Sequence, residues 1–288
     1  MKILLIGGEH FIAKNFAEKY GSRYEIFAPT AEEADFNNIS SASRYFDTHE
    51  FDCVCFIATE CASCEKFAGD DALITFKNVQ YFSVLHGVKK LLVLSDASDL
   101  GTGSVENATE ESFGLEPKNG YGLSRYLITK LAMKDKITTV LRLFNVYGKY
   151  CDVAASKTME LIARGVTGKK TATIERDREL SSIYIDDLLK ITAAFIDGDI
   201  PKGVYNVASD KPLKLTDVAR SVRRLAAKDF RTVDVELLSP DLEPSLTADI
   251  SKLASVIEKL RFTAHSAGIK AVYEHLLKHK SQARPRPV

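Results

Sequence analysis

The chain opens with Met1-Lys2-Ile3-Leu4-Leu5-Ile6-Gly7-Gly8-Glu9-His10-Phe11-Ile12-Ala13, and this stretch predicts the fold class. Residues 3–6 form a continuous apolar run, which is typical of a strand buried on both faces of a parallel sheet. A glycine turn follows, and residues 12–20 then carry a helical pattern. A buried strand, a glycine turn and a helix in this order predict the first unit of a parallel α/β fold.

The same alternation continues through the first half of the chain. Further apolar runs lie at residues 24–27, 53–58, 90–95 and 138–143, and helical patterns lie between them at 41–47, 72–86 and 121–134. Strands that alternate with helices in this way form sheets with helices on both faces. We therefore predict a Rossmann-type, doubly wound parallel sheet in an α/β domain that covers residues 1–150.

The pattern is less regular after residue 150. Helical stretches and two short apolar runs, at 182–185 and 203–207, predict a smaller C-terminal part over residues 151–280. We expect the chain to cross back from this part to the first domain. Residues 281–288 include Arg284-Pro285-Arg286-Pro287 and are predicted to form a flexible tail.

Composition and charge exclude several classes of function. The 288 residues include 39 basic and 39 acidic side chains, so the formal net charge is zero. Affinity for nucleic acids and anionic membranes depends mostly on basic charge, so we expect neither partner. No apolar run approaches the roughly 20 residues of a membrane span, and the N-terminal run is too short for a signal peptide. The cytoplasm is therefore the expected location.

The five cysteines are an odd number, which argues against a disulfide framework. Cys61 and Cys64 form a Cys-x-x-Cys pair shortly after Cys53 and Cys55. Zinc sites usually take their ligand pairs from two separate turns, whereas Cys53 and Cys55 share one face of a predicted strand. We expect no metal site. Redox chemistry at Cys61 and Cys64 is the alternative to two ordinary loop thiols.

The glycine turn is the place where this fold binds phosphate groups. Glycine lets the backbone approach a pyrophosphate, and the following helix presents its N-terminus to the negative charge. A Gly-x-x-Gly-x-x-Gly frame places glycines at positions 7, 10 and 13, but only Gly7 is present, with His10 and Ala13 at the other two. The turn alone leaves two readings open, a phosphate-binding loop and an ordinary connection between strand and helix.

Five motifs follow in order along the chain. They are residues 96–101 (Asp-Ala-Ser-Asp-Leu-Gly), 121–125 (Tyr-Gly-Leu-Ser-Arg), 141–148 (Leu-Arg-Leu-Phe-Asn-Val-Tyr-Gly), 183–187 (Ile-Tyr-Ile-Asp-Asp) and 203–207 (Gly-Val-Tyr-Asn-Val). From Met1 to about Leu277 the chain resembles the extended short-chain dehydrogenase/reductases. The resemblance implies NAD or NADP as cofactor, bound by residues 1–150. It also implies a nucleotide-activated sugar as the substrate of an epimerase, dehydratase or reductase. The segment 32–47 is most similar to the 4-keto-sugar reductases of that family.

The resemblance also implies a catalytic set. Tyr121 corresponds to the family's proton-transfer tyrosine, and Arg125 stands where the family has a lysine. An arginine keeps the positive charge that lowers the pKa of the phenol, although its planar guanidinium is larger than an ammonium group. Asp96 stands at the position of a serine or threonine, with Ser95 just before it. A register shift that brings Ser95 or Ser98 to this position is the alternative.

The implied binding residues are taken from the same family positions. For the cofactor they are Gly7, Gly8, His10, Phe11, Ile12, Asp35, Phe36, Ala58, Thr59, Tyr121 and Arg125. Asn145 and Arg178 are the implied substrate-binding residues. The second strand ends at residues 28–30 without an acidic side chain for a ribose and without an arginine for a 2′-phosphate, so NAD and NADP both stay open.

A second tyrosine with the same spacing lies on the helix predicted at 121–134. Tyr126 and Lys130 form a literal Tyr-x-x-x-Lys, but Tyr126 lies about 140° around the helix from Tyr121. If Tyr121 faces the cofactor, Tyr126 does not. The helices predicted at 72–86 and 121–134 carry apolar residues on more than one face, and the equivalent helices of the family pair between subunits. We therefore expect a homodimer.

Two hypotheses on function follow. The first is an NAD(P)-dependent enzyme that acts on a nucleotide-activated sugar. The second is a catalytically impaired relative that binds a nucleotide, a sugar or a protein partner. The second rests on the substitutions at His10, Asp96, Arg125 and Leu180, all of which fall at positions that the family uses for function.

Overall fold

Six parallel strands form the central sheet of the computed structural model, which describes residues 1–57, 70–101, 105–112, 117, 120–154, 156–168, 171–239, 241 and 245–280. The strands in spatial order are β11 (Val204–Val207), β6 (Thr138–Leu143), β4 (Lys90–Asp96), β3 (Cys53–Ile57), β1 (Lys2–Ile6) and β2 (Glu25–Phe27). Nearly all residues of the four inner strands are buried. The continuous apolar runs therefore form a parallel sheet that is covered on both faces, as predicted.

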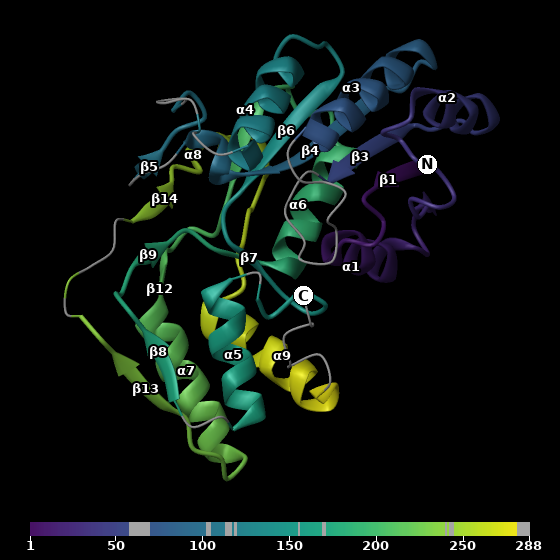
Figure 1. The fold of residues 1–288 in the computed structure, drawn as a ribbon. Helices are drawn as coiled ribbons and strands as arrows, with labels where there is room; N and C mark the ends of the chain where they lie inside the picture. Colours follow the sequence, from purple (N-terminus) through teal and green to yellow (C-terminus); the bar gives the residue numbers. More distant parts are fainter. Residues whose placement is uncertain are drawn as a thin grey trace.

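Two helical layers cover the sheet (Figure 1). Ile3 and Leu5 of β1 pack with α1 (Phe11–Tyr20) and α6 (Ile185–Asp197) in one core cluster. Leu4 and Ile6 point to the opposite face and pack with α2 (Ile39–Thr48), α3 (Asp70–Leu85) and α4 (Gly120–Ala132) in another. The period of two along the strand thus divides the core into two layers. The predicted Rossmann-type, doubly wound α/β fold is confirmed.

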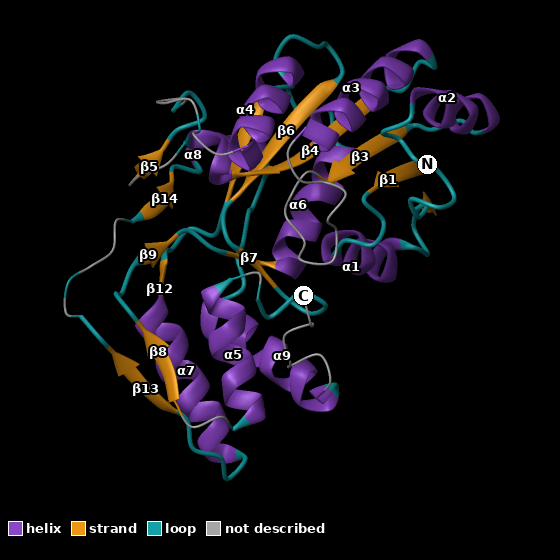
Figure 2. Ribbon diagram, viewed as in Figure 1, coloured by secondary structure: helices purple, strands orange, loops and turns teal. Residues whose placement is uncertain are grey.

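The C-terminal part contains three helices that pack on one another, α5 (Lys157–Thr167), α7 (Leu215–Lys228) and α9 (His265–Lys278). The short strands β8 (Thr171–Ile174) and β13 (Asp234–Leu237) form a parallel pair beside them (Figure 2). The short helix α8 (Ser251–Val256) precedes α9 in the chain.

The chain crosses between the two parts several times. Both α6 and β11 follow residue 150 in sequence but belong to the layers of the N-terminal sheet. A four-stranded sheet has the order β12 (Leu213–Lys214), β9 (Glu179–Leu180), β14 (Leu246–Ala248) and β5 (Val105–Ala108), so it joins an early segment to a late one. A further pair joins β7 (Val146–Tyr147) to β10 (Ile183–Tyr184). The division at residue 150 stays a prediction.

The carboxyl ends of the parallel strands lie at one edge of the sheet, where open α/β sheets bind their ligands. The turn from β1 to α1 lies at this edge. So do the end of β4 and the short helix η2 (Ala97–Leu100) that follows it. In the part of the chain that the structure describes, no helix combines the length and apolarity of a membrane span.

Candidate active site

The β1–α1 turn depends on two glycines. Gly7 has φ +89°, a backbone conformation that residues with a Cβ atom rarely adopt. Gly8 lies so close to the end of β2 that a Cβ there would be 2.7 Å from the carbonyl oxygen of Ala28. Both glycines are therefore required by the turn itself, whether or not a ligand binds.

His10 is the N-cap residue of α1. Its Nδ1 accepts a hydrogen bond from the backbone N–H of Ile12 at 3.2 Å, and its ring packs on that of Phe11 with centroids 4.7 Å apart. The side chain is buried, with 2% of its surface exposed. The residue that replaces the family's second glycine therefore covers the helix end to which this fold directs a pyrophosphate.

The remaining implied cofactor residues differ in their exposure. Phe11 and Ile12 begin α1 and are buried in the core cluster of that face. Phe36 is also buried, with its ring against those of Tyr45 and Phe46, whereas Asp35 is exposed and accepts a hydrogen bond from the backbone N–H of Asn37. Ala58 and Thr59 lie outside the described residues.

Tyr121 and Asp96 come together at the carboxyl edge of the sheet. Asp96 ends β4, and Tyr121 lies in the first turn of α4, so the two elements bring residues 25 positions apart into contact. The Tyr121 hydroxyl donates a hydrogen bond to Oδ2 of Asp96. Oδ1 of Asp96 accepts a second bond from the backbone N–H of Ser98 at 2.9 Å.

Arg125 lies one helical turn after Tyr121 on α4. Its guanidinium carbon is 4.5 Å from the centroid of the Tyr121 ring, and its side chain is completely buried. Burial raises the pKa of the Tyr121 phenol well above its ordinary range, and the negative charge of Asp96 raises it further. The positive charge of Arg125 opposes this rise. Tyr121 is therefore protonated at neutral pH in this arrangement.

The two serines near Asp96 occupy different positions. Ser95 is fully buried within β4, in register with Arg142 of β6. Ser98 is half-buried in η2 and contacts Asp96 through its backbone N–H. The Tyr121 hydroxyl donates to Asp96, the residue that stands at the serine or threonine position of the family.

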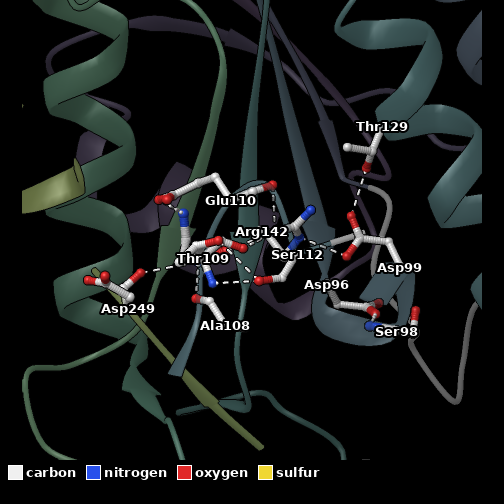
Figure 3. A network of polar contacts seen from close by, with 11 residues as sticks. Asp96, Ser98, Asp99, Ala108, Thr109, Glu110, Ser112, Thr129, Arg142 and Asp249 are labelled. Atoms are coloured by element: carbon white, nitrogen blue, oxygen red, sulfur yellow. Dashed lines mark hydrogen bonds and ion pairs between the residues drawn. The ribbon is translucent and has the colours of Figure 1, made fainter. Parts of the chain in front are cut away.

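A buried polar network lies near Asp96 (Figure 3). Nε of Arg142 is 2.7 Å from Oδ1 of Asp99, and both side chains are completely buried. Thr129 of α4 donates a hydrogen bond to Asp99, and Arg142 also donates to Oδ1 of Asn206 in β11. Burial raises the pKa of Asp99 to about 6, against the opposing effect of Arg142 and Thr129. An arginine inside the apolar run at 138–143 is the sequence signal for such a network, because a buried charge requires partners.

Asn145 follows β6 and has a positive φ of 36°. Its Nδ2 donates a hydrogen bond to the Ser182 hydroxyl at 2.6 Å and lies 3.4 Å from the Thr158 hydroxyl. These contacts join the end of the central sheet to the C-terminal part. Arg178 lies between β8 and β9, next to Asp177, which accepts hydrogen bonds from Thr216.

The cysteines and the second Tyr-x-x-x-Lys pair were the other candidates in the sequence. Cys53 and Cys55 are buried in β3, and Cys61 and Cys64 lie outside the described residues. Among the described residues, no three His, Cys, Asp or Glu side chains are arranged to hold a metal ion. Tyr126 and Lys130 are both half-buried on α4, with Nζ of Lys130 5.3 Å from the centroid of the Tyr126 ring.

The fold and the position of this site define a class of protein, the Rossmann-type α/β proteins that bind ligands at the carboxyl edge of a parallel sheet. Residues 3–208 match the NAD dependent epimerase/dehydratase family. The chain belongs to this family, which confirms the resemblance found in the sequence and supports the expectation of an enzyme. A comparison with curated protein sequences found no significant match.

Solved structures of low sequence identity share the fold over nearly the whole chain. A GDP-L-fucose synthetase from Naegleria fowleri bound to NADP has a TM-score of 0.83 at 14% identity, covering 99% of this chain and 96% of its own. A UDP-glucose 4-epimerase with UDP-glucose from Thermotoga maritima has a TM-score of 0.80 at 18% identity, covering 97% and 100%. A dTDP-glucose 4,6-dehydratase from Bacillus anthracis in complex with NAD has a TM-score of 0.80 at 15% identity, covering 98% of each chain.

Proposed function

We propose that this chain is an NAD(P)-dependent epimerase, dehydratase or reductase of a nucleotide-activated sugar, with Tyr121 as the proton-transfer residue. Family membership supports the general reaction class. The similar structures include a GDP-L-fucose synthetase bound to NADP, a UDP-glucose 4-epimerase with UDP-glucose and a dTDP-glucose 4,6-dehydratase in complex with NAD. In this proposal residues 1–150 bind the coenzyme, residues 151–280 contribute most of the substrate site, and the protein is cytoplasmic.

The observation that carries the proposal is the group formed by Tyr121, Asp96 and Arg125. A phenol that acts on a sugar oxygen needs a partner that takes up or returns a proton, and Asp96 is hydrogen-bonded to it. When a substrate hydroxyl gives its proton to the Tyr121 oxygen, the proton of Tyr121 can pass to Oδ2 of Asp96. The buried charge of Arg125 balances the negative charge of Asp96 at this site.

The backbone of the β1–α1 turn fits a dinucleotide pyrophosphate. All residues in the first turn of α1 are among those that the structure describes, and none of them is acidic. The backbone amides of Phe11, Ile12 and Ala13 are the donors that would hold the phosphates. One of these amides is already bonded to His10. The nicotinamide of a bound coenzyme would supply or accept hydride. Asn145 and Arg178 remain the proposed contacts to the substrate.

The test is turnover with a panel of nucleotide-activated hexoses and 4-keto-hexoses, followed by the absorbance of the reduced coenzyme and by product analysis. Tyr121→Phe should lower kcat by at least about a hundredfold, because it removes the group that transfers the proton. Tyr126→Phe is the matched control on the same helix and should keep wild-type turnover. Unchanged turnover in Tyr121→Phe, with the fold intact by circular dichroism, contradicts the assignment.

The non-catalytic relative is the second candidate, and two observations favour it. His10 caps the helix that would receive the pyrophosphate, and Asp96 keeps Tyr121 protonated. A protein that binds neither coenzyme and turns over no member of the panel is the result this candidate expects.

We also propose that the protein forms a homodimer through α3 and α4. Tyr81, Val84 and Leu85 of α3 each expose about 60% of their surface, which is unusual for apolar side chains that lie together. They line an open groove of about 590 Å³ with Leu131, which lies on α4.

A further inference from the structure

His10 occupies a position where a side chain and a ligand would compete for the same donor. The first-turn amides of a helix have no partner within the helix, so they bind a capping side chain, water or an anion. In α1 the amide of Ile12 donates to Nδ1 of His10 at 3.2 Å. The imidazole is 2% exposed, so it is buried against the helix end rather than extended into solvent.

The local backbone does not require histidine for this role. His10 has φ −66° and ψ 145°, an extended conformation that any residue adopts. Its backbone N–H donates to the carbonyl of Gly7 and its carbonyl accepts from Lys14, so the turn is held by main-chain bonds. Removing the side chain therefore leaves the path of the chain intact and frees the amide of Ile12.

We infer that His10 is a built-in competitor of the coenzyme, because its imidazole fills the anion position at the N-terminus of α1 and must move away before a pyrophosphate can bind. This inference rests on the proposed function, which supplies the dinucleotide. In this inference the same hydrogen bond stabilises the free protein and weakens the coenzyme complex.

The size of the effect follows from the strength of the cap. If the binding-competent state is the one with His10 displaced, the apparent affinity is reduced by the fraction of molecules in that state. N-cap bonds of typical strength keep roughly nine in ten molecules or more in the capped state. Removing the imidazole should therefore tighten coenzyme binding by about tenfold.

The experiment compares wild type with His10→Gly, His10→Asn and Ser156→Gly. Each protein is titrated with NADH and with NADPH, followed by the fluorescence of the reduced coenzyme, and the midpoint of thermal unfolding is measured without coenzyme. Asparagine at position 10 can still accept from the amide of Ile12, so it keeps the cap. Ser156 caps α5 through a bond from the backbone N–H of Met159, so its variant loses a cap at another helix.

In His10→Gly we expect coenzyme affinity to rise and thermal stability to fall. His10→Gly should bind one reduced coenzyme about tenfold more tightly and unfold at a lower temperature. His10→Asn should stay within about threefold of the wild-type affinity, since its cap is retained. Ser156→Gly should unfold at a lower temperature with unchanged coenzyme affinity. A purely structural role of His10 would lower the unfolding temperature without changing the affinity.

Three outcomes overturn the inference, and they differ in what they say about the function. Equal affinity of wild type and His10→Gly means that His10 does not compete, and the proposed function stands. Weaker binding in His10→Gly means that the imidazole contacts the coenzyme, and the function again stands. No binding of either coenzyme by any of the four proteins refutes both the inference and the use of NAD(P).

Discussion

Tyr121 has charges of opposite sign on its two sides, and their opposing effects shift the pKa of its phenol. Arg125 lies against the ring and favours the phenolate, while Asp96 accepts the bond from the hydroxyl and favours the protonated phenol. Burial adds to the effect of Asp96 and raises the pKa of Tyr121 further. With serine or threonine in place of Asp96, the charge of Arg125 would have no such opponent at the hydroxyl.

Replacement of Asp96 should therefore lower the pKa of Tyr121. Asp96→Ser and Asp96→Asn both remove the negative charge, so the phenolate should form at lower pH than in wild type. The measurement is a pH titration of phenolate absorbance in the near ultraviolet. The same titration of Tyr121→Phe is subtracted to remove the signal of the other tyrosines. A Tyr121 that titrates identically in all three proteins would show that Asp96 does not face its hydroxyl.

At the scale of the elements, α3 and α4 have two kinds of apolar face. Phe76 and Val79 of α3 and Ile128 of α4 are buried against the central sheet. Val84 and Leu85 of α3, in contrast, expose 59% and 62% of their surface. Apolar side chains on both faces explain why the helical pattern predicted at 72–86 is wider than one stripe.

If this second face is a subunit interface, a charge within it should separate the subunits. Leu85→Asp places a carboxylate among apolar side chains and should weaken the dimer by roughly a hundredfold. Ile39→Asp is the matched control, because Ile39 on α2 is 60% exposed and Leu85 is 62% exposed. Sedimentation velocity over a range of protein concentrations gives the dimer dissociation constant of each variant. The proposal is wrong if the wild-type protein is a monomer throughout that range.

At the scale of the whole molecule, Arg142 joins segments that are far apart in the chain. It contacts Asp99 after β4 and Asn206 in β11. Asn206 in turn donates to the carbonyls of Ala108 and Asp249. The network therefore connects the central sheet to the end of β5 and to the residue that follows β14.

Loss of Arg142 should destabilise the protein in a pH-dependent way. Arg142→Met leaves Asp99 buried without its counter-ion and should cost about 3–5 kcal/mol in the free energy of unfolding at neutral pH. The folded pKa of Asp99 is raised to about 6, so its contribution to stability is largest at low pH and is lost as pH rises through that value. Without Arg142 the pKa rises further, so the deficit relative to wild type should be larger at pH 8 than at pH 5.

Denaturant unfolding at the two pH values measures this deficit. The double variant Arg142→Met with Asp99→Asn is compared with the single variant Asp99→Asn. Neither protein has a titrating carboxyl at position 99, so the difference in stability between these two should change little with pH. A single variant whose deficit is the same at both pH values would contradict the role assigned to Asp99.

The fold could be predicted from the sequence because burial on both faces leaves a local signal, the continuous apolar run, in each of the four inner strands. The contact of Tyr121 with Asp96 followed from the family resemblance, which aligned both residues with one site. The partners of Arg142 could not be predicted, because the sequence does not state that β6 lies between β4 and β11. The cap at α1 was also missed, because a histidine in place of a glycine does not reveal where its ring lies.

The position of β11 has a consequence for how the chain can be shortened. This strand, from residues 204–207, covers the outer side of β6, and it is made long after the rest of the sheet. A fragment that stops near residue 150 would expose the backbone of Thr138–Leu143 as a bare, apolar sheet edge. Such edges pair with other chains and promote aggregation. A fragment of residues 1–150 should therefore aggregate when produced alone. During synthesis, the edge of β6 stays unpaired until residue 207 has been added.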